Sequence, residues 1–312
     1  GPTLQPVTSL TLNYLAADIE SRRRIAEARW DDLAAARPRL GRAVALQRRT
    51  IGRQFDQLAA FATTALPAPP PEAVVLHRLA DGIPVLRADL PPLPVDALIP
   101  VMVELGRAVS EVSGVPAGAR AAVLLARGEV DAARLLALVF QRDEDAVRQL
   151  AAEHAVAMDA LWLIADVALA PLAHLQQRVA LREDEPDSPV REALERWDTG
   201  FCPACGSWPA LAEVAYGERL LRCTFCACAW RMLTDRCAFC GTAGERFVTV
   251  TPDRARPSRR LELCRQCGGF LKVLTVDVPA PFPLPAIDDL ATADLDQAAM
   301  HHGYRRHPLP RL

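Results

Sequence analysis

Nine cysteines are the residues of this 312-residue chain whose type and spacing could do chemistry, and all lie between positions 202 and 267. Eight of them form four Cys-x-x-Cys pairs: Cys202/Cys205, Cys223/Cys226, Cys237/Cys240 and Cys264/Cys267. Two intervening residues let a tight turn direct both sulfurs at one cation, which makes half of a tetrahedral site. Four pairs therefore predict two four-cysteine sites, each able to take iron or zinc.

The spacing favours pairing these units in consecutive order. The first two give C-x2-C-x17-C-x2-C, within the zinc-ribbon range, and the last two give the slightly longer C-x2-C-x23-C-x2-C. Each intervening segment has the pattern of a β-hairpin, with strands expected at 211–216 and 220–223, then at 247–251 and 260–263. A hairpin with a cysteine pair at each end closes its own site, so we expect consecutive pairing rather than a cross-braced arrangement.

The residue after each pair sets the turn. Three pairs are followed by glycine, at Gly206, Gly241 and Gly268, which takes a positive φ cheaply and lets backbone N–H groups point at the thiolates. Ala227 follows Cys226 instead, which predicts a different turn there.

Cys228 is the ninth cysteine and belongs to no pair. A reactive thiol, an alternate ligand and a small buried residue beside the metal site are all possible roles, and we favour the buried residue.

Charge argues against nucleic acid as the partner. Residues 202–274 hold eleven Arg or Lys and six Asp or Glu, a formal +5, but each divalent ion with four thiolates carries −2, so two sites leave about +1. A local basic patch remains on the loop of the second hairpin, where a partner protein or a phosphate could bind. It consists of Arg254, Arg256, Arg259 and Arg260.

Four thiolates fill a tetrahedron and leave no position for a water to be activated. The sequence also has no Gly-rich phosphate loop, no His-Glu-x-x-His and no nucleophile elbow. We therefore expect metals that are structural or, if iron, redox-active, in a protein that is not itself an enzyme.

The elements that precede the cysteines are expected to be helical, because half of the residues are hydrophobic and only 5% are aromatic. Apolar residues recur every three or four positions over 12–66, with Pro38 dividing two helices, and again over 98–112, 120–126, 130–140 and 143–181. The last of these is apolar nearly all round and predicts the central helix of a bundle, kinked at Pro171. Proline-rich segments at 67–71 and 84–100 predict a linker and irregular packing, and the charged segment 182–189 marks a boundary.

No apolar run reaches the roughly 18 residues that a membrane span needs, and the start of the chain lacks the pattern of a signal sequence. Cysteines confined to one region fit reduced, metal-bound thiolates better than an extracellular disulfide framework. The sequence predicts a cytoplasmic protein without a membrane span.

The cysteine region resembles the formate dehydrogenase accessory protein FdhE family. The resemblance rests on four motifs and on the tail, as follows: Phe201-Cys-Pro-Ala-Cys-Gly206; Leu221-Arg-Cys-Thr-Phe-Cys226 with Trp230; Cys237-x-x-Cys240; Cys264-Arg-Gln-Cys-Gly-Gly-Phe-Leu-Lys272; and Asp288-Asp-Leu-Ala291, Leu295-Asp296 and Gly303-Tyr304. Together these cover about the last third of the chain. Cys228 is not part of the family pattern, and Gly269-Phe270 varies a position that is often polar or aromatic.

The resemblance implies a multidomain α+β fold, with an N-terminal helical bundle, two rubredoxin-like modules and a C-terminal helical tail. The boundaries we expect are 1–185 for the helices, 198–232 and 233–278 for the modules, and 279–312 for the tail. It also implies a factor that binds the catalytic subunit of respiratory formate dehydrogenase and supports its assembly into active enzyme. A nucleic-acid-binding zinc ribbon and an iron or thiol redox protein remain the alternatives.

Overall fold

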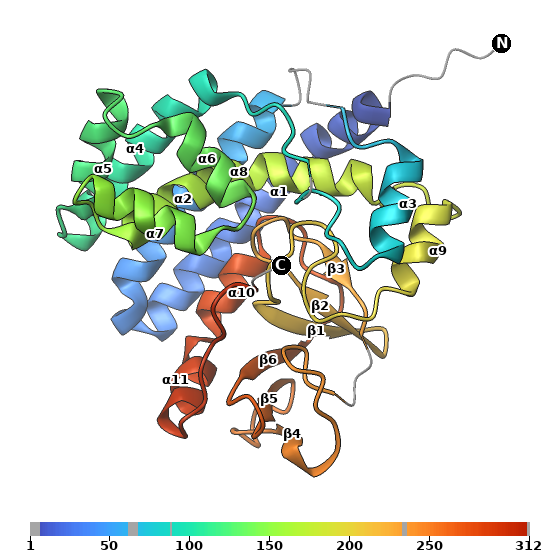
Figure 1. Ribbon diagram of the computed structural model, residues 1–312. Coiled ribbons are helices and arrows are strands. Elements are labelled where there is room, and N and C mark those ends of the chain that lie inside the picture. Colours follow the sequence, from blue (N-terminus) through green and yellow to red (C-terminus); the bar gives the residue numbers. More distant parts are fainter. Residues whose placement is uncertain (1–6, 62–67, 88, 233–235, 311–312) are drawn as a thin grey trace. The chain divides into compact units, whose positions relative to one another are not determined.

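The computed structural model describes residues 7–61, 68–87, 89–232 and 236–310, with side chains from residue 18 onward (Figure 1). The chain divides into two compact units. Unit 1 comprises Gly1–Pro69 and Leu86–Val179, and unit 2 comprises Pro70–Val85 and Ala180–Leu312. The domain boundaries expected from the sequence stay a prediction.

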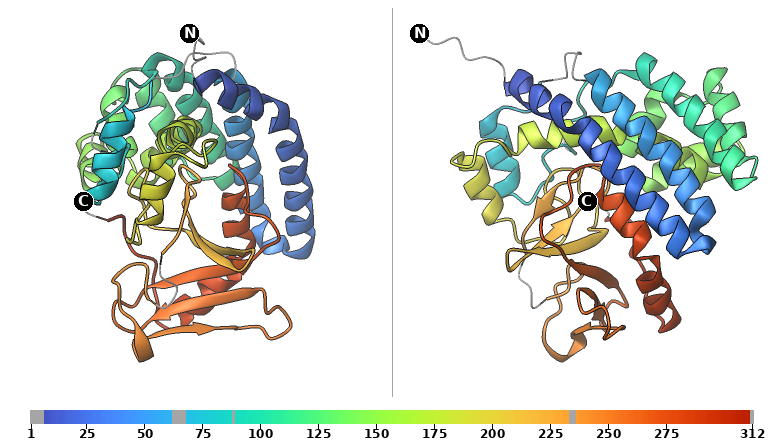
Figure 2. Two further views of the ribbon diagram at one scale, coloured as in Figure 1. Left: turned by 90° about the vertical axis from the view of Figure 1, so that its right-hand side faces the viewer. Right: turned by 180° about the vertical axis from the view of Figure 1, so that it is seen from behind.

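Unit 1 is helical, as the apolar periodicity predicts. Its helices are α1 (Val7–Ala36), α2 (Gly41–Phe61), α4 (Val95–Ser113), α5 (Ala117–Ala126), α6 (Ala132–Phe140), α7 (Glu144–Glu153) and α8 (Met158–Ala180). The division at Pro38 is confirmed, because a short 3-10 turn, Pro38–Leu40, separates α1 from α2. These two long helices lie side by side (Figure 2). The end of the second predicted helix and the start of the linker at 67–71 lie outside the described residues.

Helix α8 supplies much of the apolar interior of unit 1, with Ala165, Leu169 and Leu172 fully buried. Pro171 lies inside α8 and has no N–H to donate to the carbonyl of Val167, four residues earlier. Gln54 of α2 donates to that carbonyl at 3.1 Å, so the hydrogen bond that proline removes is replaced from a neighbouring helix.

The single helical segment expected over 143–181 is wrong in one respect, because α7 ends at Glu153 and α8 begins at Met158. Ala155 has a φ of 49°, which no α-helix accommodates. Arg120 of α5 donates its Nε to the Ala155 carbonyl at 3.0 Å and stabilises the carbonyl that the break leaves outside the helices.

By length and composition α8 could cross a membrane, but 72% of its most apolar window is buried inside the protein. Core helices of soluble proteins pass the same test, so this is weak evidence for a span.

Unit 2 contains helices α3 (Glu72–Ala80) and α9 (Pro189–Glu195), a six-stranded sheet, and helices α10 (Pro285–Ala291) and α11 (Ala293–His301). The strands are β1 (Leu211–Ala215), β2 (Glu218–Arg222), β3 (Ala229–Trp230), β4 (Phe247–Val250), β5 (Arg259–Cys264) and β6 (Phe270–Thr275). Their order is β3-β2-β1-β6-β5-β4.

Both predicted hairpins form. Strand β1 pairs antiparallel with β2, and β4 pairs antiparallel with β5. The sequence did not predict β6, which pairs antiparallel with β5 and parallel with β1, with Leu211 opposite Lys272. Because β6 lies between the two hairpins, the segments expected as two modules share one continuous sheet.

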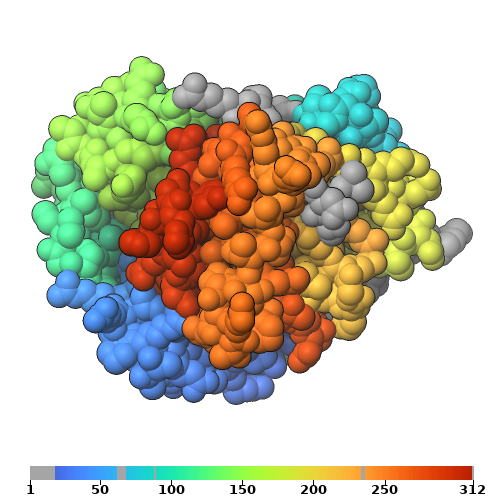
Figure 3. Space-filling model, turned by 90° about the horizontal axis from the view of Figure 1, so that it is seen from below, coloured from blue at the N-terminus to red at the C-terminus, as the bar shows by residue number. Residues whose placement is uncertain are grey.

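The sheet packs against the C-terminal helix α11. Leu211, Leu261 and Phe270 of the sheet form one buried cluster with Leu295 and Ala299 of α11. In Figure 3 the residues of α11, in red, lie against the orange residues of the second hairpin. The predicted C-terminal tail is therefore helical over much of its length and belongs to the core of unit 2.

Candidate metal centres

The first cysteine group consists of Cys202, Cys205, Cys223 and Cys226, all buried. Sulfur–sulfur distances are 3.6 Å for Cys202–Cys226 and for Cys205–Cys223, and 3.7 Å for Cys205–Cys226. Four sulfurs bound at about 2.3 Å to one tetrahedral ion lie about 3.8 Å apart. The group thus has the dimensions of a metal site with four thiolate ligands.

The second cysteine group consists of Cys237, Cys240, Cys264 and Cys267. Its sulfurs lie 3.8 Å apart for Cys237–Cys267 and 3.6 Å apart for Cys240–Cys264, which also fits one tetrahedral ion. Unlike the first group it is partly open to solvent, because Cys240 is exposed and Cys267 is half-buried. Both groups follow the consecutive pairing that the hairpins predict.

All four cysteine turns share one backbone pattern. The N–H of the first cysteine donates to the carbonyl five residues on, at distances from 2.8 to 3.1 Å, in the pairs Cys202–Ser207, Cys223–Cys228, Cys237–Thr242 and Cys264–Gly269. The positive φ expected at the glycines is present, between 70° and 80°. The different turn expected at Ala227 is wrong, because Ala227 has a φ of 57° and adopts the same left-handed conformation despite its Cβ.

The fifth residue beyond the first cysteine of a turn can also contact the sulfur ligands. Ser207 Oγ lies 3.3 Å from Cys205 Sγ, and Thr242 Oγ1 lies 3.2 Å from Cys240 Sγ. Cys228 holds the equivalent position in the second turn and is 1% exposed. Three of the four turns carry Ser, Cys or Thr at this position and the fourth carries Gly269, a pattern that is visible in the sequence.

The protein environment makes the first group hard to ionise without a cation. Burial raises the pKa of the Cys202 and Cys226 thiols well above the ordinary value, and hydrogen bonding to neighbouring thiols raises the pKa of Cys223. A metal ion bound there must displace these protons, so binding releases protons and weakens as the pH falls.

The second group has one readily ionised thiol. Burial opposes ionisation of Cys240, but hydrogen bonds from the hydroxyl and the backbone N–H of Thr242 outweigh it and lower the pKa of Cys240 to about 7. Burial raises the pKa of Cys267 to about 11, and it also raises the pKa of Cys237. Cys240 is therefore partly ionised at neutral pH.

A buried ion pair lies beside the first cysteine group. Glu213 of β1 is fully buried and pairs with Arg222, the residue before Cys223. Arg222 also donates to the carbonyls of Ala280 at 2.6 Å and of Ala227 at 3.4 Å. This ties the alanine turn of the first group to the segment that leads into α10.

The two cysteine groups contact each other through residues 198–208, around the first cysteine turn, and residues 236–239, in the third cysteine turn. Gly200 lies so close to Ala238 that a Cβ on Gly200 would come within 1.5 Å of the Ala238 carbonyl oxygen. Arg236 pairs with Asp198, and the rings of Trp208 and Phe239 meet edge to face at 5.4 Å. These contacts join the first and third cysteine turns directly.

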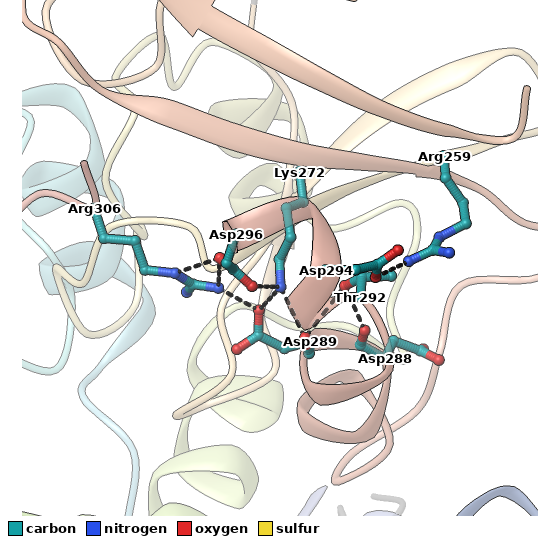
Figure 4. Close-up of polar contacts among 8 residues, drawn as sticks. All are labelled: Arg259, Lys272, Asp288, Asp289, Thr292, Asp294, Asp296 and Arg306. Carbon is teal, nitrogen blue, oxygen red and sulfur yellow. Dashed lines mark hydrogen bonds and ion pairs between the residues drawn. The ribbon is translucent and has the colours of Figure 1, made fainter. Parts of the chain in front are cut away.

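Lys272, the only lysine of the chain, lies on β6 with 1% of its side chain exposed. Its Nζ is 2.6 Å from Asp289 Oδ1 and 2.7 Å from Asp296 Oδ2, and it donates to the Asp289 carbonyl at 2.7 Å (Figure 4). Arg306 pairs with the same two carboxylates at 2.7 and 2.6 Å. The cluster of Lys272, Asp289, Asp296 and Arg306 thus anchors α10 and α11 to the sheet.

The predicted basic patch is partly engaged within the chain. Arg256 pairs with Asp253 at 2.7 Å, and Arg259 pairs with Asp294 of α11 (Figure 4). Arg254 is exposed and Arg260 is half-buried. A partner surface at these arginines stays a prediction.

Sequence reasoning missed His307, which no cysteine motif indicates. Its Nε2 lies 3.2 Å from Cys267 Sγ, and its ring stacks on Phe239 with centroids 4.7 Å apart. The residue is 40 positions beyond Cys267, so only the folded tail brings the two together.

No family model matches the chain. The chain is 35% identical over 115 residues to a protein from Pseudomonas putida and 25% identical over 120 residues to one from Aquifex aeolicus, each named "Protein FdhE homolog". It also matches the crystal structure of the FdhE protein from Pseudomonas aeruginosa with a TM-score of 0.57 and 23% identity, over 99% of this chain and 96% of that chain. About a third of the chain is thus similar in sequence to FdhE homologues, and the chain shares the fold of a solved FdhE protein.

These matches confirm the resemblance to FdhE proteins that the cysteine motifs indicate. The sequence matches span 36% of the P. putida relative and 42% of the A. aeolicus relative, so the chain covers less than half of these FdhE homologues. The structural match extends the common fold over nearly the whole chain.

Proposed function

We propose that this chain is a cytoplasmic accessory factor that binds the catalytic subunit of respiratory formate dehydrogenase and supports its assembly into active enzyme. The observation that carries the proposal is the presence of two all-thiolate groups, each with tetrahedral dimensions, in a chain similar to FdhE homologues. Such centres fix the shape of a module rather than activate a substrate, because four thiolates leave no position for water.

The eight paired cysteines would be the metal ligands, and each ion would hold together segments that are far apart in the chain. Iron and zinc both accept four thiolates in a tetrahedron. A metal in the buried first group would be structural. The exposed Cys240 makes the second group the one at which iron could exchange electrons. Metal analysis of the protein purified from its own host decides which ion is bound.

Replacement of single cysteines tests the ligand assignment. Cys202→Ser and Cys264→Ser should each remove one metal equivalent, measured by inductively coupled plasma mass spectrometry. Cys228→Ser is the matched control, because Cys228 is buried beside the first group but belongs to neither group of four. Unchanged metal content in either ligand variant would contradict the assignment.

Co-purification tests the partner. Tagged wild-type protein should retain the formate dehydrogenase catalytic subunit from cells that make it, and Cys202→Ser and Cys264→Ser should lose both this retention and dehydrogenase activity in the cell. Cys228→Ser should keep both. Salt-dependent retention on DNA or RNA without the dehydrogenase would favour the nucleic-acid alternative instead.

A further inference from the structure

Residues 304–307, which follow α11, lie against the second cysteine group beside Cys267. The Arg305 N–H donates to the Gly268 carbonyl at 2.8 Å, and Arg305 forms a parallel bridge with Gly269. Arg306 pairs with Asp289 and Asp296. The tail is therefore held by its backbone and by the ion cluster immediately before the point where His307 meets Cys267.

Two features of the chain accommodate the imidazole of His307. Phe239, inside the third cysteine turn, stacks on the ring at an interplanar angle of 29°. Gly269 leaves the space that the ring occupies, because a Cβ at that position would come within 2.5 Å of His307 Nε2. Glycine at position 269 therefore leaves room for the imidazole beside Cys267.

The direction of the hydrogen bond follows from the chemistry of the sulfur. A metal-bound thiolate has no proton to donate, so at 3.2 Å the imidazole Nε2–H must be the donor and Cys267 Sγ the acceptor. A hydrogen bond to a ligand from a residue outside the coordination sphere orients that ligand and stabilises its charge, and losing such a partner typically costs about 10- to 100-fold in metal affinity.

We propose that His307 is part of the second metal centre, where its Nε2–H donates to the metal-bound Cys267 thiolate, so that metal binding and docking of residues 304–307 stabilise each other. The coupling is reciprocal. If docking of the tail raises the metal affinity by a given factor, metal binding raises the equilibrium constant for docking of the tail by the same factor. This inference rests on the metal-binding part of the proposed function and is independent of the partner.

Metal transfer from the zinc-loaded full chain to a chromogenic chelator tests it. The two centres should release zinc in two phases, the faster from the partly exposed second group; Cys264→Ser, which lacks that centre, identifies this phase. His307→Phe keeps a ring to stack on Phe239 but has no N–H, so the second-centre phase should accelerate about 10-fold or more. His302→Phe is the matched control, because His302 is exposed on the same tail, and should release zinc at the wild-type rate.

Two more variants separate the hydrogen bond from a loss of folding. His307→Gln restores an N–H donor and should recover part of the slow release, whereas Gly269→Ala should displace the unaltered imidazole and release zinc as fast as His307→Phe. In the cobalt-loaded protein, the thiolate-to-cobalt charge-transfer band of the second centre should shift to lower energy in His307→Phe and return toward the wild-type energy in His307→Gln.

The reciprocal effect is seen by amide hydrogen exchange, where removal of the second metal should increase exchange at residues 304–307 more than in α9. The inference would be overturned if the rate of zinc release from the second centre in His307→Phe lay within twofold of the rate in His302→Phe and the cobalt spectrum were unchanged. The proposed metal site would then still stand. A chain that binds no metal at the second group would instead refute the proposed metal site.

Discussion

Replacing Lys272 by methionine keeps a long unbranched side chain on β6 but removes its charge and its three contacts with α10 and α11. These contacts are to Asp289 Oδ1, to Asp296 Oδ2 and to the carbonyl of Asp289, all between 2.6 and 2.7 Å. The two carboxylates would stay in place, 27% and 14% exposed, without their shared ammonium group. The variant therefore tests whether this buried ion cluster holds the two C-terminal helices on the sheet.

The magnitude follows from what remains after the substitution. Removing one partner of a buried pair typically costs about 3–5 kcal/mol, because the other charge is left uncompensated. Arg306 still pairs with both carboxylates from the surface, so we expect a smaller loss of about 2–3 kcal/mol in the free energy of local opening. That loss corresponds to a decrease of about 30- to 150-fold in hydrogen-exchange protection of α10 and α11.

Amide hydrogen exchange with mass spectrometry is the assay, on the zinc-loaded protein at about pH 7.5, because it resolves unit 2 from the helices of unit 1. Arg196→Met is the control, because Arg196 pairs with Glu192 on α9 and both side chains are 70% exposed. This variant should change the hydrogen-exchange protection of α10 and α11 by less than about threefold. Arg306→Met should give an intermediate effect, because it leaves Lys272 in place.

The pH dependence provides a second check. Burial alone would raise the pKa of Asp289, but the charges of Lys272 and Arg306 outweigh it and lower the pKa below its ordinary value. The stability that this carboxylate contributes is thus present above about pH 4 and lost as the pH falls through the lowered pKa. If Lys272→Met leaves the protection of α10 and α11 within about threefold of wild type at neutral pH, apolar packing holds these helices and the reasoning about the cluster is wrong.

Three further predictions concern the cysteine groups. Ala227→Gly should relieve a left-handed residue with a φ of 57° and stabilise the zinc-loaded protein by up to about 1 kcal/mol, seen as a higher midpoint of thermal unfolding, whereas a lower midpoint would mean that the alanine methyl contributes more by packing than its conformation costs. Gly200→Ala should destabilise unit 2 by about 3 kcal/mol or more, because the added Cβ would overlap the Ala238 carbonyl. An unchanged midpoint of thermal unfolding would show that the two cysteine groups are not tightly packed at this position. Lowering the pH from about 8 to about 6 should weaken cobalt binding more at the first group, measured in Cys264→Ser, than at the second group, measured in Cys202→Ser. The raised pKa values of Cys202 and Cys226 mean that more protons must be displaced at the first group, whereas Cys240, with its pKa of about 7, is already partly ionised. Equal slopes of cobalt affinity against pH at the two groups would refute this prediction.

The sequence by itself determined the features that depend on neighbours along the chain. Two residues between cysteines are enough to aim both sulfurs at one point, and alternating apolar residues flanking a glycine turn are enough to predict the β1–β2 hairpin. Pro38 divides α1 from α2 because a proline cannot donate within a helix. The grouping of the eight cysteines followed from these local rules.

Only the tertiary structure decided the features that depend on residues far apart in the chain. Ala227 keeps the glycine-like turn where its carbonyl meets Arg222, and α7 ends at Glu153 where Arg120 bonds the carbonyl beyond the break. Strand β6 joins the two hairpins, Lys272 finds its carboxylates on α10 and α11, and His307 reaches Cys267 from 40 residues away. Each of these contacts forms because the packed chain offers a partner whose position no local pattern of residues encodes.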